Sequence, residues 1–361
     1  MFLFTKLNLY AKIVVTILFF EVFMNKKHIC IIHTGGTIGM IRSSHGYLPK
    51  AGYLETVLSS IADLKDESMP LYDFYEMNPL LDSSDMAVGD WNKIGEEIAK
   101  RYESYDGFVI LHGTDTMAYT AAALSFMLKN LNKPVILTGS QIPLCEVRSD
   151  GQDNLVTSLI IAGDARVKEV CLYFGGRLLR GNRATKMSAD GLLAFDSPNC
   201  PRLAEAGISI RYLPVPPPPK ADDTALELKK FADVPIGVLK VFPGISFPIF
   251  DKLMTEKLRG IVLETFGAGN IPGEGDSLLP IIRKAFNAGS VVTVCSQCPQ
   301  GTVSLGTYAT SSPLKDAGAV SGFDMTTEAA VAKLYYLFSQ NLTKEEIKSK
   351  MEENLRGELT K

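Results

Sequence analysis

Short apolar runs alternate with longer amphipathic stretches along most of this chain. The runs are rich in Val and Ile, as expected for strands that are buried on both faces of a sheet. The stretches between them repeat apolar residues at intervals of three and four, the spacing of one helix face; an example is Leu124, Met127, Leu128 and Leu131. The alternation predicts an α/β fold with a mainly parallel sheet that helices flank on both faces.

The predicted elements succeed one another without an internal repeat. Strands are expected at residues 28–32, 73–77, 108–111, 135–138, 170–174, 236–241, 260–264 and 291–295. Helices are expected at residues 53–61, 91–102, 124–131, 155–162, 250–254, 278–288 and 331–338. A last helix should begin at the capping box Thr343-x-x-Glu346 and end before Gly357.

A proline-rich segment divides this pattern. Residues 213–219 read Leu-Pro-Val-Pro-Pro-Pro-Pro, which can neither continue a helix nor pair in a central strand. We therefore predict a larger N-terminal α/β domain at residues 24–211 and a Pro-rich linker at 212–234, which includes a short helix. A smaller C-terminal α/β domain should occupy residues 235–361.

Residues 1–23 differ in character from the rest of the chain. Lys6 and Lys12 precede an apolar run at residues 13–20, which Glu21 interrupts. The run is too short to cross a bilayer, which takes about 20 apolar residues, so no membrane association is expected. A signal peptide is the other interpretation, but no small-x-small cleavage site precedes Met24. We expect Met24 to be the initiator and residues 1–23 to be an N-terminal extension or a non-native start.

Composition and charge narrow the class of protein. The chain has 361 residues, of which 46% are hydrophobic, and its formal net charge of −3 argues against a nucleic-acid partner. Six cysteines, mostly within apolar runs, fit a cytoplasmic protein better than a disulfide framework. The four histidines lack metal-site spacing, and the one Cys-x-x-Cys segment has no second pair. Neither a metal nor another cofactor is expected.

Two threonine-containing loops come directly after predicted buried strands. One reads Thr-Gly-Gly-Thr at residues 34–37, and the other reads His-Gly-Thr-Asp-Thr at residues 112–116. Taken alone, the first loop fits a structural turn as well as an active site. The first strand is not followed by either glycine pattern of nucleotide sites. The sequence also contains no G-x-S-x-G elbow, the motif of Ser-His-Asp hydrolases. What remains is a hydroxyl nucleophile, which needs a neighbouring base.

Five segments together resemble one known family. They match motifs of bacterial L-asparaginases, and their residues resemble those of the cytoplasmic, type I branch. The segments are Thr34–Met40, Asp82–Met86, Leu111–Tyr119, Thr138–Pro143 and Arg180–Lys186. The resemblance extends from about residue 24 to the C-terminus and leaves residues 1–23 outside. It implies two α/β domains, with the catalytic residues in the N-terminal one.

The resemblance implies a catalytic role for several residues. Thr37 corresponds to the nucleophile, and Tyr47, on a mobile loop, to the tyrosine that helps to activate it. Thr114, Asp115 and Lys186 correspond to a second catalytic group, in which a partly desolvated lysine can accept a proton from the threonine hydroxyl. Backbone N–H groups near the glycine loop and Thr114 would stabilise the oxyanion.

The resemblance also implies how substrate is held. Asp115 would bind the α-ammonium group and Ser83 the α-carboxylate, beside Asp82 and Ser84. Asn270 would reach the site from a neighbouring subunit, so a homodimer or homotetramer is expected. Ser84 departs from the glutamine of secreted relatives, which bears on glutamine preference. His112 and Thr116 are interpreted as residues that shape their turn, and His33 as a core residue. The segment at 148–150 is interpreted as a structural loop with an internal ion pair.

The implied reaction is the hydrolysis of L-asparagine to L-aspartate and ammonia through a threonine acyl-enzyme. Two alternatives stay open: a glutaminase-asparaginase, and a non-catalytic asparagine sensor that keeps the pocket. The family also includes a transfer-RNA amidotransferase subunit with an extra N-terminal domain, for which residues 1–23 leave no room.

Overall fold

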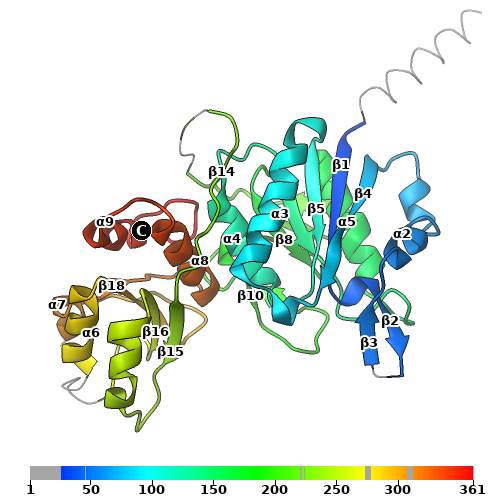
Figure 1. Cartoon of the computed structure of the whole chain (residues 1–361). Coiled ribbons are helices and arrows are strands. Elements are labelled where there is room, and N and C mark those ends of the chain that lie inside the picture. The colour runs from blue at the N-terminus through cyan, green and yellow to red at the C-terminus, as the bar shows by residue number, and fades with distance from the viewer. Residues whose placement is uncertain are drawn as a thin grey trace, which may run out of the picture.

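The computed structural model describes residues 26–44, 46–219, 222, 224–272, 278–306 and 312–360. The expected extension at 1–23 and the expected initiator Met24 lie outside the described residues. The described chain forms two α/β lobes, each with its own sheet (Figure 1). The mixed α/β class and the mainly parallel larger sheet confirm the predicted fold class.

The larger lobe is built on an eight-stranded sheet. From one edge to the other the strands are β13 (Ile210–Tyr212), β12 (Ala204–Ala206), β9 (Arg177–Arg180), β8 (Val170–Phe174), β7 (Val135–Thr138), β5 (Gly107–Leu111), β1 (His28–Gly35) and β4 (Leu71–Leu81). The strands from β8 to β4 are parallel, and β9, β12 and β13 add an antiparallel edge. The antiparallel edge was not predicted from the sequence.

Helices cover both faces of this sheet, as Figure 1 shows. On one face, Ile32 and Ile110 pack in a core with α3 (Val88–Arg101) and α4 (Met117–Met127). On the other face, the alternate residues Ile31 and Val109 pack with α2 (Tyr53–Leu58) and α5 (Gly151–Asp164). Because successive side chains of a strand point to opposite faces, the continuous apolar runs result from burial on both sides.

The order of the parallel strands creates a crevice at one edge of the sheet. In sequence they run β1, β4, β5, β7, β8, but in space β1 lies between β4 and β5. The chain passes from β1 to β4 on one side and then crosses to β5 on the other. In open α/β sheets such a reversal of strand order forms a crevice beyond the carboxyl ends of the strands. The loops that come after β1, β4, β5 and β7 meet there, at residues 36–39, 82–85, 112–116 and 139–141.

Short strand pairs surround this edge. A hairpin of β2 (Met40–Ser43) and β3 (Gly46–Pro49) projects from the larger lobe directly after the first loop (Figure 1). A second short pair, β10 (Thr185–Lys186) and β11 (Phe195–Asp196), lies near the same end of the sheet. Both pairs carry residues that the sequence singled out, because Tyr47 lies in β3 and Lys186 in β10.

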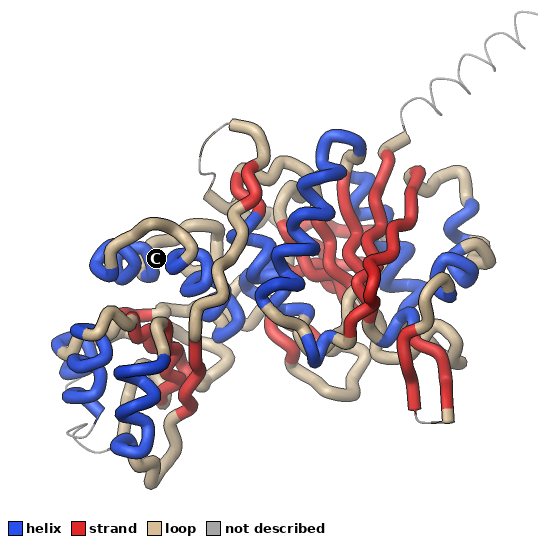
Figure 2. The backbone as a smooth tube through the Cα atoms, viewed as in Figure 1, coloured by secondary structure: helices blue, strands red, loops and turns tan. Residues whose placement is uncertain are grey.

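The smaller lobe has a four-stranded parallel sheet, drawn in red at the lower left of Figure 2. Its strands are β15 (Ile236–Lys240), β16 (Gly260–Thr265), β17 (Val291–Ser296) and β18 (Val320–Ser321). Its helices are α6 (Leu278–Asn287), α7 (Ser312–Asp316), α8 (Thr327–Phe338) and α9 (Lys344–Met351). The predicted capping box begins α9, since Thr343 and Glu346 cap each other's backbone N–H groups.

Helix α8 joins the smaller lobe to the larger one. Its Tyr336 ring stacks on Phe126 of α4, with ring centroids 5.7 Å apart. Its Tyr335 ring contacts Trp91 of α3 and Phe231 of the linker segment. The apolar junction therefore fixes the two lobes to each other. Within the described residues, no helix is both long and apolar enough to cross a membrane.

Several predicted helices differ from the structure. Those expected at 53–61 and from Thr343 to before Gly357 end earlier, at Leu58 of α2 and at Met351 of α9. Helix α4 ends at Met127 rather than Leu131, because the next residues form β6 (Leu128–Lys129) and pair with β14 (Glu227–Leu228). That pairing takes the place of the short helix expected in the linker, as far as the linker is described. The helix expected at 250–254 is a 3₁₀ turn at Phe247–Phe250 and then a π-helical turn at Leu253–Lys257.

Candidate active site

The first threonine loop is packed directly against the second. Gly36, after the end of β1, has a φ of 85°, a backbone conformation that favours glycine. A Cβ added at Gly36 would lie 2.3 Å from the backbone N of Gly113, so only glycine fits between the loops. The hydroxyl of Thr34 ties the same ends together by donating to the carbonyl of Leu111 at 2.9 Å. The backbone beside Thr37 therefore lies against the loop that carries Thr114.

Within the described part of the chain, no hydrogen bond joins Thr37 and Tyr47. Thr37 is half-buried and begins a short 3₁₀ turn. Tyr47 is 44% exposed, and its hydroxyl accepts a hydrogen bond from Nη2 of Arg42 at 3.4 Å. The Arg42 Nε donates in turn to Glu146 at 3.1 Å. In this structure the hairpin thus presents Tyr47 outward, toward solvent.

The structure brings Thr114, Asp115 and Lys186 together. The ammonium group of Lys186 donates to Oγ1 of Thr114 at 2.9 Å and to Oδ1 of Asp115 at 2.7 Å. The Thr114 hydroxyl donates its own proton to Oε1 of Gln141 at 3.0 Å. Lys186 is therefore a hydrogen-bond donor here, and it would have to lose a proton before it could act as a base.

Gln141 is a site residue that sequence reasoning missed. Its Nε2 donates to the carbonyls of Ala189 and Gly191, both at 3.2 Å, which leaves Oε1 as the acceptor that faces Thr114. Its place in the matched segment at 138–143 was the only signal. Asp150 holds the same loop, because its carboxylate accepts the backbone N–H groups of residues 141 and 142. The ion pair expected within 148–150 is wrong: among the described residues, Asp150 has no ionic partner at Arg148.

The residues after β4 form a further loop of the site, beside the two threonine loops. Asp82 caps its own turn, since its Oδ1 accepts from the backbone N–H and the hydroxyl of Ser84, each at 3.0 Å. Ser83 is buried, and its carbonyl accepts from the Thr116 hydroxyl at 2.8 Å. A Cβ at Gly113 would lie 2.3 Å from Oγ of Ser83, so the serine hydroxyl sits against the second loop.

Two further predicted residues lie elsewhere. Asn270 is in the smaller lobe, in the turn after β16 that a backbone bridge between Phe266 and Asn270 closes. Its expected role concerns a neighbouring subunit and stays a prediction. His33 is buried in β1, and burial lowers its pKa to about 4, as fits a neutral core residue.

Taken together, the four loops place hydroxyl groups and a paired lysine and carboxylate at one edge of the larger sheet. This set of groups suits acyl transfer, in which a hydroxyl attacks and backbone N–H groups stabilise the oxyanion. Within the described residues, no group of three or more His, Cys, Asp or Glu side chains is placed to hold a metal ion.

Comparison with known proteins agrees with this geometry. The family model for the asparaginase N-terminal domain matches residues 28–217, and that for the glutaminase/asparaginase C-terminal domain matches residues 235–351. The chain is 49% identical to L-asparaginase 1 of Escherichia coli K12 over 337 residues, which cover 93% of this chain and 99% of that protein.

Two solved structures have the same architecture. One is L-asparaginase I from Vibrio cholerae, with a TM-score of 0.86 at 49% identity, covering 93% of this chain and 100% of that chain. The other is the thermostable L-asparaginase from Thermococcus kodakarensis, with a TM-score of 0.82 at 31% identity, covering 92% and 99%. The chain therefore belongs to the asparaginase family of hydrolases, and within it to the type I branch.

Proposed function

We propose that this enzyme hydrolyses the side-chain amide of L-asparagine to L-aspartate and ammonia through an ester on Thr37. The observation that carries the proposal is the pairing of two loops: Thr37 is mounted on one, and the hydrogen-bonded Lys186, Thr114 and Asp115 border the other. Family membership supports the same reaction, because relatives with 49% identity are named L-asparaginases.

The reaction takes place in two displacements. In the first, Thr37 Oγ1 attacks the amide carbon, its proton passes to a base, and the amide oxygen takes up negative charge. The C–N bond then breaks, the nitrogen leaves as ammonia after protonation, and an aspartyl ester of Thr37 remains. In the second, water attacks the ester carbon, and the Thr37 oxygen leaves with a proton as L-aspartate is released.

The proton carriers in this proposal are Tyr47 and Lys186. Tyr47 would activate Thr37 once the hairpin folds over the crevice and exchanges its hydrogen bond from Arg42 for one with Thr37. Lys186 exchanges protons with Thr114, to whose oxygen it is already hydrogen-bonded. The Thr114 hydroxyl donates its hydrogen bond to Oε1 of Gln141, so its lone pairs face the lysine.

Substrate recognition is assigned from the charges at the crevice. The Asp115 side chain is 64% exposed, and we assign it the α-ammonium group as a second cation beside Lys186. The α-carboxylate is assigned to the hydroxyl of Ser83, beside Asp82 and Ser84 in the same turn. Asn270 of a neighbouring subunit completes the site.

Assembly, compartment and domain limits are further parts of the proposal. A homodimer or homotetramer is required by the role given to Asn270. A cytoplasmic location is supported by the six free cysteines in the described chain. Domains at 24–211 and 235–361, joined by a linker at 212–234, are supported by family models that match 28–217 and 235–351.

Ammonia release from purified protein tests the proposal. Wild type should release ammonia from L-asparagine, Thr37→Ala should lose about 1000-fold or more, and the matched Thr37→Ser, which keeps a hydroxyl, should retain part of the activity. Comparable turnover of L-glutamine would favour a glutaminase-asparaginase. Asparagine binding without turnover in wild type would favour a sensor. Undiminished turnover in Thr37→Ala would contradict the mechanism.

A further inference from the structure

A buried chain of hydrogen bonds runs from helix α3 to the second threonine loop. Nε1 of Trp91 donates to Oγ1 of Thr120 at 3.0 Å, and that oxygen lies 2.9 Å from Nε2 of His112. Nδ1 of His112 lies 2.8 Å from the carbonyl oxygen of Gly113. His112 and Thr120 are 0% exposed and Trp91 is 7% exposed, so water does not compete for these bonds.

We call this chain of hydrogen bonds, from Trp91 through Thr120 and His112 to Gly113, the relay. Each proton in it has one possible position. The Gly113 carbonyl only accepts, so Nδ1 of His112 must carry a proton. Burial lowers the pKa of His112 to about 4, so the ring is neutral at pH 7 and Nε2 accepts. The Thr120 hydroxyl therefore donates to His112, and its lone pair receives the indole N–H of Trp91, which can only donate.

The inner end of the relay sets one peptide plane. In a trans peptide the carbonyl of Gly113 and the N–H of Thr114 point in opposite directions within one plane. Because the carbonyl is held toward the buried imidazole, the Thr114 N–H points away from it. Gly113, the residue that begins this peptide, lies between Gly36 and Ser83, so its Cα has little room to move. In the proposed reaction, this N–H is a donor to the oxyanion.

The outer end of the relay lies at the junction of the two lobes. The Trp91 indole meets the ring of Tyr335, on α8, with centroids 5.8 Å apart and planes at 78°. It meets Phe231, in the linker segment, at 6.3 Å and 90°. Both backbone groups of Phe231 are bound by the Asn92 side chain, each at 2.8 Å. The position of Trp91 is therefore fixed by the smaller lobe and the linker.

From this geometry we infer that His112 is a positioning residue: the relay from Trp91 through Thr120 carries the packing of the lobe junction to the Gly113–Thr114 peptide and so orients the Thr114 N–H. The consequence for catalysis rests on the proposed function. The orientation itself does not, because it results from hydrogen bonds of buried groups alone.

Four variants separate positioning from general stability. Thr120→Val keeps the shape of the side chain and removes the hydroxyl, which leaves Nε2 of His112 unpaired. His112→Asn places an amide N–H near the position of Nδ1, whereas His112→Gln places its amide near Nε2 and abandons the Gly113 carbonyl. Ser125→Ala is the matched control, since Ser125 lies on the same helix and donates only to the carbonyl of Ala121.

Two measurements are made on each variant, with the melting temperature as a folding check. With L-asparagine as substrate, His112→Gln and Thr120→Val should lower kcat about 10- to 100-fold, because a small displacement of a catalytic group costs that much, while KM changes less than about threefold. His112→Asn should recover most of kcat, and Ser125→Ala should match wild type. Hydrogen exchange of the backbone N–H groups in residues 112–117 should rise in His112→Gln and Thr120→Val only.

The two readouts distinguish failure of this inference from failure of the proposed function. If wild type does not hydrolyse asparagine, hydrogen exchange alone decides whether the relay holds the peptide. Wild-type exchange at 112–117 in both His112→Gln and Thr120→Val overturns the inference. It is also overturned if kcat falls equally in Ser125→Ala, if His112→Asn is as impaired as His112→Gln, or if only KM changes.

Discussion

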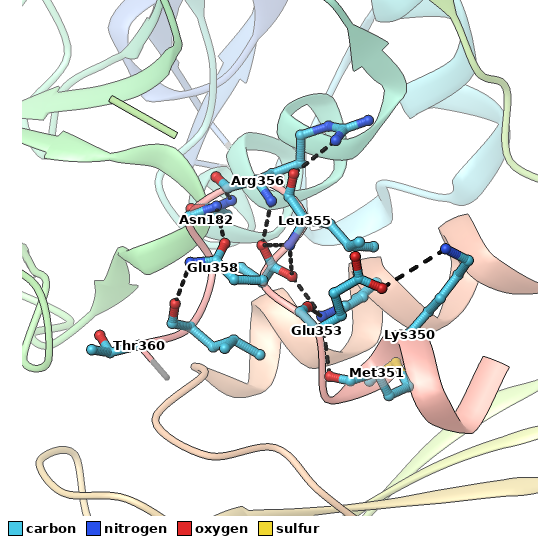
Figure 3. A network of polar contacts seen from close by, with 12 residues as sticks. Asn182, Lys350, Met351, Glu353, Leu355, Arg356, Glu358 and Thr360 are labelled. Carbon is cyan, nitrogen blue, oxygen red and sulfur yellow. Dashed lines mark hydrogen bonds and ion pairs between the residues drawn. The ribbon is translucent and has the colours of Figure 1, made fainter. Parts of the chain in front are cut away.

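A fully buried ion pair makes a sharp prediction about stability. Lys333 of α8 and Glu358 of the C-terminal tail are both 0% exposed, and Nζ of the lysine lies 2.5 Å from Oε1 of the glutamate. Figure 3 shows Glu358 beside Leu355 and Arg356 of the same tail. The ammonium group also donates to the carbonyls of Met351 and Glu353, at 3.0 and 2.5 Å. The carboxylate accepts the backbone N–H groups of residues 355 and 356. The pair thus fixes the course of the tail after α9.

Removing one partner leaves the other charged and buried. Lys333→Met should therefore cost about 3–5 kcal/mol in the free energy of unfolding, and Glu358→Gln should cost a similar amount. The double variant Lys333→Met/Glu358→Gln leaves no isolated charge, so it should lose less than the sum of the single variants. The expected coupling energy is about 1–3 kcal/mol.

Urea unfolding at pH 7, monitored by far-ultraviolet circular dichroism, measures these costs. Lys350→Met is the matched control, because Lys350 is 41% exposed and its ion pair with Glu353 spans 3.8 Å. The control should lie within about 0.5 kcal/mol of wild type. A cost below about 1 kcal/mol for Lys333→Met, or strictly additive single variants, would refute the reasoning that the isolated buried charge causes most of the destabilisation.

The site itself supports three more predictions. Gly36→Ala should abolish most activity, because its Cβ would lie 2.3 Å from backbone of the neighbouring loop at a φ of 85°; activity together with the melting temperature would show whether the loop alone is disturbed. Gln141→Leu removes the acceptor for the Thr114 proton, so kcat should fall at least about tenfold with a smaller change in KM, and an unchanged kcat would contradict the assigned proton direction. Burial lowers the pKa values of His33 and His112 from 6.5 to about 4, so their contribution to stability is complete above pH 6.5 and is lost as pH falls toward 4. At about 1.4 kcal/mol per pKa unit each histidine should contribute about 3 kcal/mol, and urea midpoints that stay flat from about pH 7 to about pH 4.5 would contradict this.

The strands and the threonine loops were predictable because local sequence determines them. Residues 135–138 and 170–174 are continuous apolar runs, and β7 and β8 have those limits. In a parallel sheet, loops after neighbouring strands share one edge, and the structure packs the loop of Thr37 against the loop of Thr114. Their individual roles came from the resemblance of whole segments, not from hydrophobic periodicity.

Contacts between distant segments could not be predicted. The apolar periodicity continues to Leu131, but the chain leaves the helix at Met127 because Leu128 pairs with Leu228, a partner far away in sequence. The bond from Thr114 to Gln141 joins two loops that periodicity treats independently. The relay through His112 likewise depends on how α3 and α4 pack, which no local pattern specifies.

The central claim is that Thr37 carries the acyl group, and rapid acid quenching tests it most directly. Wild-type enzyme is mixed with L-asparagine, quenched within the first turnover, digested and analysed by mass spectrometry. We expect an aspartyl ester on the peptide that contains Thr37, and no such adduct in Thr37→Ala. An ester on Thr114 instead, or undiminished ammonia release by Thr37→Ala, would contradict the claim.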